Sequence, residues 1–299
     1  MKTLKKIYLA SPRGFCAGVK RAVDFLDLVL QKHKPHIYVR HQIIHNRHVI
    51  SDFKKKGVIF VEDINNIPNG SVVVFSAHGS PSSLYEKAKK KKLQIYDAVC
   101  PLVTKVHLEA KKYTKEGYFI FYIGHKNHPE AIGVLGEVSD QSIILIETLE
   151  DAEKIIPPQT DKLIVLTQTT LSFDDTKLII NCLKRRFTKL IQPPAFDICY
   201  ATQNRQNAVK ALAKKVDLVL VIGSKESSNS NRLREVAEKE GVSSYLINDI
   251  SEIKNSWFKD VEKLGITAGA SAPKYLIDEV VKYFSKPKVK IEELTYENS

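Results

Sequence analysis

The stretch Ser11–Phe25, SPRGFCAGVKRAVDF, places Cys16 between a glycine-containing turn and a helical pattern. Ahead of it, Ile7–Ala10 is a short apolar run typical of a strand. Behind it, apolar residues recur at helical spacing, at Val19, Ala22, Val23 and Leu26. The stretch therefore predicts a strand, a tight turn and a helix, with a cysteine at the corner between them.

Two further cysteines stand in the same local setting. Cys100 lies in IYDAVCPLVTKVHLEAKKY and Cys199 in FDICYATQNRQNAVKALAKK. Each follows a short strand-like piece and opens a helix with Lys or Arg in its first turns. The spacings (100 − 16 = 84 and 199 − 100 = 99) indicate an internal repeat. The fourth cysteine, Cys182, lies inside the amphipathic pattern LIINCLKRRF, and we interpret it as a buried apolar residue.

Polar residues at strand ends follow each cysteine in the same order. The first set lies 28 or 29 residues on (45 − 16, 128 − 100 and 227 − 199) and consists of His45, His128 and Ser227. The second lies 62 to 72 residues on (78 − 16, 169 − 100 and 271 − 199) and consists of His78, Thr169 and Ser271. Chance is the alternative, because strand–helix alternation in any α/β protein gives some such matches. We favour three α/β units of about 90 residues, because three features recur together.

Strand-like runs alternate with helical patterns along the chain, at HIYVRHQII, SVVVFSAH, YFIFYIGH, KLIVLTQTT, DLVLVIGS and GITAGAS. They predict the α/β class, with three similar lobes and mostly parallel sheets. We expect lobes over 14–98, 99–195 and 196–284, with the strand in 1–13 associated with the third and 285–299 as an appended, mobile end. Ligands bind outside the carboxyl ends of strands in open α/β sheets, so a pseudo-threefold arrangement would direct the cysteines to one central point.

Composition limits the class of protein. The chain has 299 residues, 43% of them apolar, but neither an apolar run that could span a bilayer nor the apolar stretch of a secretory signal. We therefore expect a cytoplasmic protein whose cysteines are buried, metal-ligating or reactive rather than paired. The net charge of +12 has two interpretations: solvated helix ends and loops, or attraction of an anionic partner such as nucleic acid, an acidic protein or a phosphorylated metabolite.

Three converging cysteines indicate a metal centre. A Cys₃His zinc site is one possibility, although the CxxC spacing of structural zinc sites is absent from the sequence. The other is an iron–sulfur cluster. A [4Fe–4S] cube needs four ligands, so three cysteines would leave one iron open as a Lewis-acid site for a substrate oxygen. Basic residues and the N-termini of the three helices would offset the thiolate charge.

The polar residues that the repeat gathers around this point are rich in hydrogen-bond donors. They suit an anion with many oxygens, such as a phosphate or diphosphate. The set comprises His45, His78, His128, Ser227, Ser228, Asn229 and Ser271. Its segment SSNSN also has the simpler interpretation of a helix N-cap. Glu130, in HPEAIG, is either a proton donor to the bound substrate or a helix-start glutamate that interacts with the helix dipole.

Nine motifs between residues 11 and 273 together resemble those of the 4-hydroxy-3-methylbut-2-enyl diphosphate reductase family, in the family's order. They are SPRGFCAGVKRA, YVRHQIIHNRHV, FSAHGS, DAVCPLVTKVH, GHKNHPE, TQTTLS, DICYATQNRQ, GSKESSNSNRL and TAGASAP. The motifs extend over nearly the whole chain, so the resemblance implies a fold and an activity for all of it.

By this resemblance, the lobes surround a [4Fe–4S] cluster held by Cys16, Cys100 and Cys199. The histidine, serine and asparagine set would bind the diphosphate, Thr169 would lie near the substrate hydroxyl, and Glu130 would feed the proton network. The implied reaction is the reductive dehydroxylation of (E)-4-hydroxy-3-methylbut-2-enyl diphosphate to isopentenyl and dimethylallyl diphosphate, the last step of the methylerythritol phosphate route to isoprenoids. Electrons would come from flavodoxin or ferredoxin with its reductase, acidic proteins that a basic chain would attract.

Two other functions are compatible with parts of the pattern. A hydro-lyase would use the open iron without net electron transfer and would turn over without a reductant. A basic nucleic-acid-binding or redox-sensing protein would use the charge and the cysteines instead. Aromatic residues do not interleave with the basic runs as a stacking platform requires, so we expect no nucleic-acid partner, and no membrane partner either.

Overall fold

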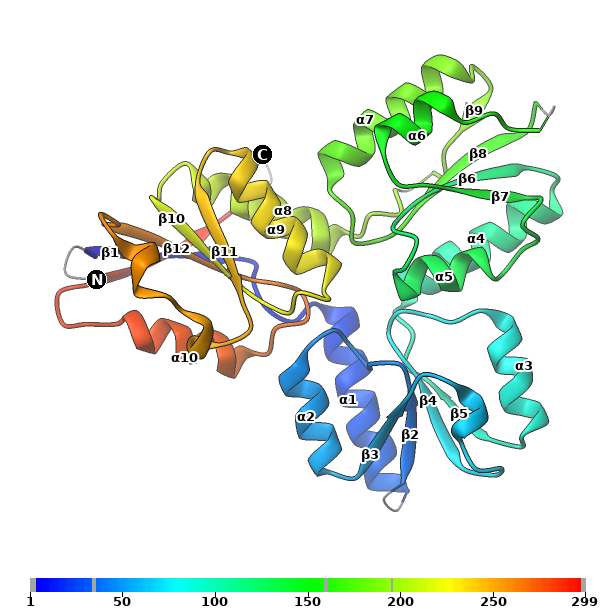
Figure 1. The fold of residues 1–299 in the computed structure, drawn as a ribbon, viewed down its shortest axis with the longest axis horizontal. Coiled ribbons are helices and arrows are strands. Elements are labelled where there is room, and N and C mark those ends of the chain that lie inside the picture. The colour runs from blue at the N-terminus through cyan, green and yellow to red at the C-terminus, as the bar shows by residue number, and fades with distance from the viewer. Residues whose placement is uncertain (1–3, 34–35, 159–160, 195, 297–299) are drawn as a thin grey trace. The chain divides into compact units, whose positions relative to one another are not determined.

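The computed structural model describes residues 4–33, 36–158, 161–194 and 196–296. The chain divides into two compact units: unit 1 comprises Met1–Ala17, His45–Val49 and Tyr200–Ser299, and unit 2 comprises Gly18–Ile44 and Ile50–Cys199. The described residues form one sheet in unit 1 and two in unit 2, and the paired strands are parallel in all three (Figure 1). The predicted α/β class with three parallel-sheet lobes is therefore confirmed.

The sheet of unit 1 has the strand order β11-β10-β12-β1-β13. Its strands are β1 (Lys6–Ser11), β10 (Leu218–Ile222), β11 (Ser243–Ile247), β12 (Lys263–Ala268) and β13 (Lys290–Thr295). The helices of this unit are α8 (Tyr200–Ala213), α9 (Ser228–Lys239) and α10 (Lys274–Phe284), with short 3₁₀ helices at Ile250–Glu252 and Asn255–Phe258.

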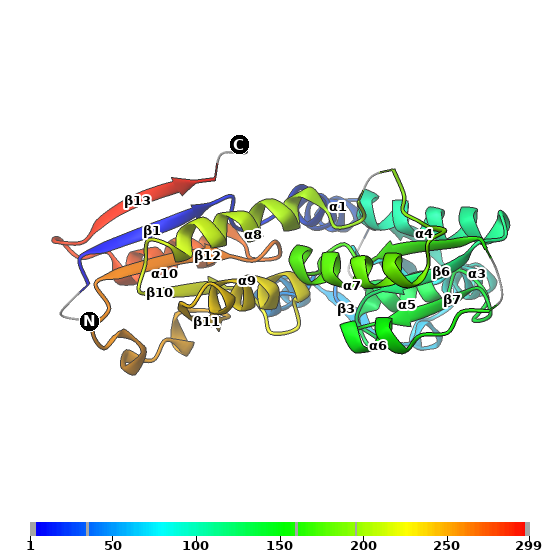
Figure 2. The same cartoon turned by 90° about the horizontal axis from the view of Figure 1, so that it is seen from above.

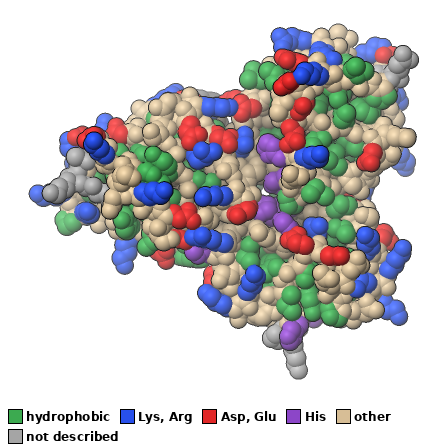
Figure 3. All heavy atoms as spheres, viewed as in Figure 1, with side chains coloured by type: hydrophobic (Ala, Val, Ile, Leu, Met, Phe, Trp, Pro, Cys, Tyr) green, Lys and Arg blue, Asp and Glu red, His purple; other side chains and the backbone are tan. Residues whose placement is uncertain are grey.

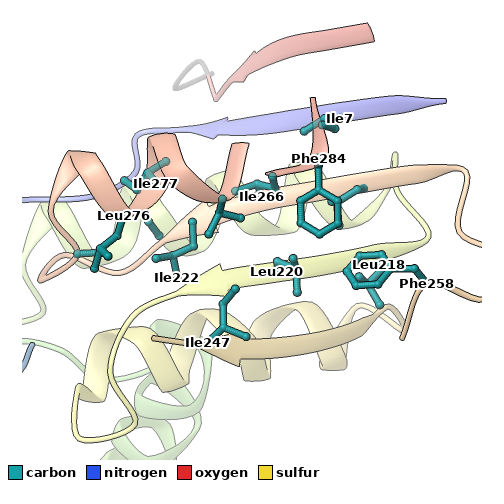
Figure 4. Close-up of a cluster of buried hydrophobic side chains, with 14 of the residues drawn as sticks. Ile7, Leu218, Leu220, Ile222, Ile247, Phe258, Ile266, Leu276, Ile277 and Phe284 are labelled. Atoms are coloured by element: carbon teal, nitrogen blue, oxygen red, sulfur yellow. The ribbon is translucent and has the colours of Figure 1, made fainter. Parts of the chain in front are cut away.

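Alternation along the inner strands separates the cores on the two faces of this sheet. Leu218, Leu220 and Ile222 pack with residues of α10 such as Leu276 and Phe284 (Figure 4). The intervening Val219 and Val221 pack on the opposite face with α8 and α9. Both faces of β10 are buried, which accounts for its uninterrupted apolar run LVLVI.

Strand β13 corrects the expectation that residues 285–299 form an appended, mobile end. Lys290–Thr295 pairs in parallel with the whole of β1, beside which it lies at one edge of the sheet (Figure 2). Its side chains are nearly all exposed, so the sequence shows no apolar alternation. Backbone pairing and the ion pair between the Lys6 Nζ and Glu292 Oε2 atoms, at 2.6 Å, hold it instead. Residues 1–3 and 297–299 of the two predicted ends lie outside the described residues.

The first sheet of unit 2 has the order β3-β2-β4-β5. Its strands are β2 (Ile37–Arg40), β3 (Val58–Val61), β4 (Val72–Phe75) and β5 (Gln94–Asp97). The helices in this part of the chain are α1 (Ala17–Lys32), α2 (Arg47–Lys55) and α3 (Ser82–Lys90), with a 3₁₀ helix at Ile64–Asn66. Phe75 of β4 stacks on Tyr85 of α3, with ring centroids 4.1 Å apart, and joins helix to sheet.

The second sheet of unit 2 has the order β7-β6-β8-β9. Its strands are β6 (Phe119–Ile123), β7 (Ile143–Ile146), β8 (Leu163–Thr167) and β9 (Leu190–Ile191). Its helices are α4 (Pro101–Lys115), α5 (Pro129–Leu135), α6 (Leu149–Lys154) and α7 (Phe173–Arg186). Helices α4 and α5 share one apolar core and α6 and α7 the other. Cys182 of α7 is buried in the second core, as predicted for an apolar residue.

Among the described residues, no helix combines the length and the apolar character that crossing a membrane would require.

Candidate active site

The three predicted cysteines each stand immediately before a helix. Cys16 precedes α1, Cys100 is the N-cap of α4 and Cys199 precedes α8, and all three are partly buried. Each backbone N–H donates over 3.1 Å to a carbonyl oxygen just beyond a strand. The acceptors for Cys16, Cys100 and Cys199 are Ala270 beyond β12, Ala77 beyond β4 and Thr169 beyond β8. The three corners are built alike, as the repeat predicts.

The Cys100 thiol lies against the first turn of α1. A Cβ atom on Gly18 would come within 2.5 Å of the Cys100 Sγ atom, so glycine leaves the space that the sulfur occupies. Gly18 is also the second residue after Cys16 in the sequence. Helix N-termini favour the thiolate, which is the form that binds metals. A set of partly buried thiols at helix starts suits an iron–sulfur cluster.

The predicted polar residues occupy equivalent positions after the inner strands of each sheet. Five residues beyond the ends of β2, β6 and β10 (45 − 40, 128 − 123 and 227 − 222) stand His45, His128 and Ser227. Two or three residues beyond the ends of β4, β8 and β12 (78 − 75, 169 − 167 and 271 − 268) stand His78, Thr169 and Ser271. The two strands involved are hydrogen-bonded neighbours in every sheet. Their carboxyl ends are where open α/β sheets bind ligands.

The predicted residues fall in both units. Unit 1 holds Cys16, His45, Ser227, Ser228, Asn229 and Ser271. Unit 2 holds Cys100, Cys199, His78, His128, Glu130 and Thr169.

In unit 1, the serines and the asparagine form one hydrogen-bonded set at the start of α9. The Ser227 Oγ atom accepts from the Ser230 N–H at 3.3 Å and from the Ser271 hydroxyl at 3.3 Å. The Asn229 Oδ1 atom accepts from the Ala270 N–H at 2.8 Å. The buried Nδ2 of Asn229 has no partner among the residues that the structure describes. Hydroxyls, N–H groups and an unused amide donor at a helix N-terminus suit an anion.

Two glycines allow α9 to approach the strand ends, a feature that the sequence analysis missed. A Cβ atom on Gly223 or Gly269 would lie 2.2 or 2.0 Å from the Ser230 Oγ atom. These glycines directly follow β10 and β12, and their signal is the glycine after each apolar run in LVLVIGS and GITAGAS. Close contact of backbone and helix brings the start of α9 onto the carboxyl edge of its sheet.

His45 belongs to a short segment of unit 1 that Asp249 fixes. Arg47 and His48 contact the Asp249 Oδ2 atom at 2.5 and 2.8 Å. Partial burial opposes ionisation, but hydrogen bonds from Ser251 and Arg47 hold the pKa of Asp249 well below its usual value. The His45 side chain itself is buried.

In unit 2, three histidines lie edge to face. The His78 ring centroid is 6.1 Å from that of His128 and 5.9 Å from that of His41. The His128 Nδ1 atom caps α5 by accepting from the Glu130 N–H at 3.2 Å. A neutral His128 ring therefore carries its proton on Nε2, where it can donate to a ligand. His41 was not predicted, although it stands in the motif YVRHQIIHNRHV.

Glu130 is a buried carboxyl group that Thr169 holds with two hydrogen bonds. Its Oε1 and Oε2 atoms accept from the backbone N–H and the hydroxyl of Thr169, at 2.7 and 3.0 Å. Burial raises the pKa of Glu130 to about 7, because these neutral donors only partly offset the loss of solvent. Near neutral pH, Glu130 is therefore able to hold a proton or release it.

Asp197 is a second buried carboxylate, and the sequence analysis did not single it out. Its Oδ1 atom accepts from the Lys105 Nζ atom of α4 at 2.8 Å, and its Oδ2 atom from the Thr167 N–H at 2.9 Å. Burial raises its pKa even though Lys105 favours the charged form. Asp197 thus connects the helix that begins after Cys100 with the segment that ends at Cys199.

Comparisons with known proteins agree with this geometry. Residues 7–285 match the family described as LytB protein. A protein from Polaromonas sp. (strain JS666 / ATCC BAA-500) named 4-hydroxy-3-methylbut-2-enyl diphosphate reductase is 50% identical over 94% of this chain and 84% of its own length. The solved structure of the E-1-hydroxy-2-methyl-but-2-enyl-4-diphosphate reductase from Plasmodium falciparum is 39% identical, with a TM-score of 0.96 over 99% of this chain and 93% of that one. A structure of (E)-4-hydroxy-3-methyl-but-2-enyl diphosphate reductase, "the terminal enzyme of the non-mevalonate pathway", has a TM-score of 0.65 at 34% identity and covers 93% and 98% of the two chains.

Proposed function

This chain belongs to the LytB protein family, and we propose that it reduces (E)-4-hydroxy-3-methylbut-2-enyl diphosphate to isopentenyl and dimethylallyl diphosphate in the last step of the non-mevalonate pathway. The observation that carries the proposal is Glu130, a buried carboxyl group with a pKa of about 7 that accepts hydrogen bonds from the backbone and the hydroxyl of Thr169. Loss of a hydroxyl group as water needs such a proton donor.

Cys16, Cys100 and Cys199 would hold a [4Fe–4S] cluster. Three partly buried thiols, each directly before a helix and each fixed through its backbone N–H, support this assignment. The space that Gly18 leaves beside the Cys100 sulfur supports it as well. When bound, such a cluster supplies electrons for the reduction and, with three protein ligands, one iron open to the substrate.

The diphosphate group would be bound by the polar residues beyond the strand ends. They are His45, His78, His128, Ser227, Ser228, Asn229 and Ser271. The unused Nδ2 donor of Asn229 and the Nε2–H of His128 are suited to phosphate oxygens. Thr169 would lie near the substrate hydroxyl, since its own hydroxyl already contacts Glu130.

The proton and electron balance assigns a role to Glu130. The allylic C–O bond breaks, Glu130 gives its proton to the departing oxygen, and that oxygen leaves as water. Two electrons from the external donor reduce the allylic fragment, which takes a second proton at one of two carbons. The position of that proton decides between isopentenyl and dimethylallyl diphosphate. The part that this chain plays is to bind, to orient and to supply the first proton.

Flavodoxin or ferredoxin with its reductase would supply the electrons in the cytoplasm. The net charge of +12 supports attraction of a small acidic protein. On the face in Figure 3, Lys and Arg side chains are interspersed with Asp and Glu and do not form one continuous basic area. Net charge would therefore raise the rate of encounter, while the contact surface depends on more than charge.

Anaerobic purification with iron and sulfide analysis, electron paramagnetic resonance and a substrate assay with dithionite tests the proposal. We expect about four iron and four sulfide per chain, and turnover that requires the reductant. Cys100→Ser should lose the cluster signal, whereas Cys182→Ser, in the α7 core, should keep it. A protein that contains only zinc, or turnover without a reductant, would contradict the proposal and favour a zinc site or a hydro-lyase.

A further inference from the structure

The loop from His78 to Ser82, which leads from β4 to α3, contacts α5 and the residues that flank it at several points. Next to the edge-to-face pair of His78 and His128, Gly79 meets Gly133, whose Cβ atom would lie 3.5 Å from the Gly79 carbonyl carbon. Pro81 meets Gly136, whose Cβ atom would lie 2.7 Å from the Pro81 Cβ. The separation at Gly133 is ordinary van der Waals contact, whereas at Gly136 a side chain would overlap Pro81. The His78–Ser82 loop is therefore packed from the N-cap of α5 to its C-cap.

His107 of α4 lies against both glycines. A Cβ atom on Gly79 would come within 2.6 Å of its Nε2 atom, and one on Gly133 within 3.0 Å. The ring is nearly buried, and its Nε2 atom has no hydrogen-bond partner among the residues described. His107 of α4 thus packs against both the His78–Ser82 loop and α5, where the two lobes of unit 2 meet.

Glu137, just after α5, binds three side chains with one carboxylate. Its Oε1 atom is 2.7 Å from the His107 Nδ1 atom, and its Oε2 atom accepts from Ser82 at 2.6 Å and from Lys111 at 2.8 Å. Burial opposes ionisation, but the hydrogen bonds from His107, Lys111 and Ser82 lower the pKa of Glu137 to about 2. The carboxylate is charged at neutral pH and can only accept, so His107 carries a proton on Nδ1.

These polar contacts matter because the junction is incompletely filled. A cavity of about 320 Å³ lies beside them, and its lining includes Ser82, Tyr85, His107, Lys111 and Glu137. Apolar packing is therefore not continuous between α3 and α4. The Glu137 carboxylate supplies the connection there, since Ser82 begins α3 while His107 and Lys111 belong to α4.

We propose that Glu137 and His107 are positioning residues for the diphosphate site. They hold the His78–Ser82 loop on α5 near its C-terminus. They thereby fix the distance between His78 and His128, the N-cap of α5. This inference rests on the proposed function of the two histidines. Glu137 does not touch the substrate itself, so its loss should weaken binding of substrate and transition state equally.

The test is Glu137→Gln in the anaerobic holoenzyme, with inorganic diphosphate as the calorimetric probe. Gln keeps the shape of the side chain but loses the charge that orders His107, Ser82 and Lys111. We expect the diphosphate Kd and the substrate KM to rise about tenfold and kcat to stay within about twofold. The control is Glu150→Gln, an exposed glutamate of α6 paired with Lys154, and it should change none of the three.

Unchanged Kd and KM in Glu137→Gln, with a lowered Tm, would overturn the inference, because the cluster would then serve stability alone. If Glu137→Gln fails to fold, Ser82→Ala decides the question. It removes the 2.6 Å hydrogen bond to Glu137 and the 2.8 Å hydrogen bond that the Ser82 Oγ atom accepts from Lys111, and keeps the carboxylate. Kd should rise about threefold, whereas no change would overturn the inference. A wild-type holoenzyme that neither binds diphosphate nor reduces the substrate would overturn the proposed function first, and this inference with it.

Discussion

Glu130 and Glu137 stand at opposite ends of α5, and both side chains are enclosed. Glu130 is 2% exposed, and the Glu137 side chain is 4% exposed. Their pKa values nevertheless move in opposite directions from 4.5, to about 7 for Glu130 and to about 2 for Glu137. Two residues of the same type, one helix apart, are therefore in opposite protonation states over much of the acidic pH range.

The difference lies in the charge of the partners. Glu130 receives two hydrogen bonds, both from neutral groups of Thr169, and these do not replace the solvent that burial removes. Glu137 receives its hydrogen bonds from Lys111 and His107 as well as Ser82, and these more than compensate. Glu130 also lies in the first turn of α5, where the helix dipole favours ionisation, but burial outweighs this effect. Burial with neutral donors makes Glu130 a proton donor, and burial beside the Lys111 cation makes Glu137 a structural connection.

Exchanging Glu130 for Gln should have the largest effect on turnover. Gln can accept the Thr169 backbone N–H bond on its amide oxygen and donate from its amide nitrogen to the Thr169 hydroxyl oxygen, but it has no acidic proton. We therefore expect kcat to fall at least about 100-fold while the diphosphate Kd stays unchanged. Single-turnover reduction and calorimetry measure the two quantities. Glu137→Gln is the matched variant and should show the reverse, a raised Kd with a nearly unchanged kcat. A kcat within tenfold of wild type in Glu130→Gln would remove Glu130 from the proton path.

The pH dependence of stability should separate the two glutamates by sign. The folded-state pKa of Glu130, about 7, exceeds 4.5, so between these values the folded state binds more protons and stability falls as pH rises. Removing this group in Glu130→Gln should relieve up to about 3 kcal/mol above pH 7 and little at pH 4.5. Glu137, with a pKa of about 2, contributes stability above 4.5 that is lost as pH falls toward 2.

Thermal unfolding of both variants and wild type across this pH range checks both signs. The Tm difference between Glu130→Gln and wild type should grow with rising pH, and that between Glu137→Gln and wild type should shrink with falling pH. Parallel curves for Glu130→Gln and wild type would mean that the Glu130 carboxyl group has the same pKa in the folded and the unfolded protein.

The sequence predicted the inner strands of each sheet and missed the edges. The six apolar runs correspond to β2, β4, β6, β8, β10 and β12, and Ile7–Ala10 corresponds to β1. All seven lie inside their sheets, and β4, β6, β8 and β10 are buried along their whole length, which gives nearly continuous apolar sequence. The edge strands β5 and β13 have exposed or partly exposed side chains, and they are held mainly by backbone pairing. No pattern in the sequence could indicate that pairing.

In the candidate site, too, some features were predicted from the sequence and others were missed. Cysteines and polar residues at strand ends were predicted because the repeat places them at fixed positions after inner strands. The contact between Glu130 and Thr169, 39 residues apart, depends on tertiary packing, so the sequence located both residues but not their pairing. Glu137 and Asp197 were missed altogether. Their partners come from different helices and strands, and no local motif marks a buried carboxylate that meets a lysine.

Exchanging Glu137 for Gln should lower stability by a moderate amount. The variant leaves Lys111 and His107 beside a neutral amide, but Lys111 is 45% exposed and solvent can replace part of its interaction. We expect a loss of about 2 kcal/mol at neutral pH, which lowers the Tm by about 5 °C. Glu150→Gln, which removes a surface ion pair, should leave the Tm within about 1 °C. Equal Tm values for the two variants would show that the buried contacts of Glu137 add no stability.

Exchanging Thr169 for Val should have the smallest effect. It removes the single hydroxyl that partly offsets the rise in the pKa of Glu130 caused by burial. Valine keeps the backbone N–H bond of 2.7 Å and loses the hydroxyl bond of 3.0 Å. Because that bond lowers the pKa of Glu130, its loss should raise the pKa by about half a unit. An acid catalyst loses activity as pH rises through its pKa, so the alkaline limb of the kcat profile should move to higher pH.

The limb reports the pKa even if Thr169→Val also lowers the maximum rate. The matched control is Thr114→Val in α4, because the buried hydroxyl of Thr114 has no hydrogen-bond partner within the described part of the chain. That variant should leave the limb in place. A limb that moves to lower pH in Thr169→Val would mean that the hydroxyl stabilises the protonated carboxyl group. Neutral donors would then favour the acid form of Glu130 directly, and burial would no longer be the main cause of the contrast with Glu137.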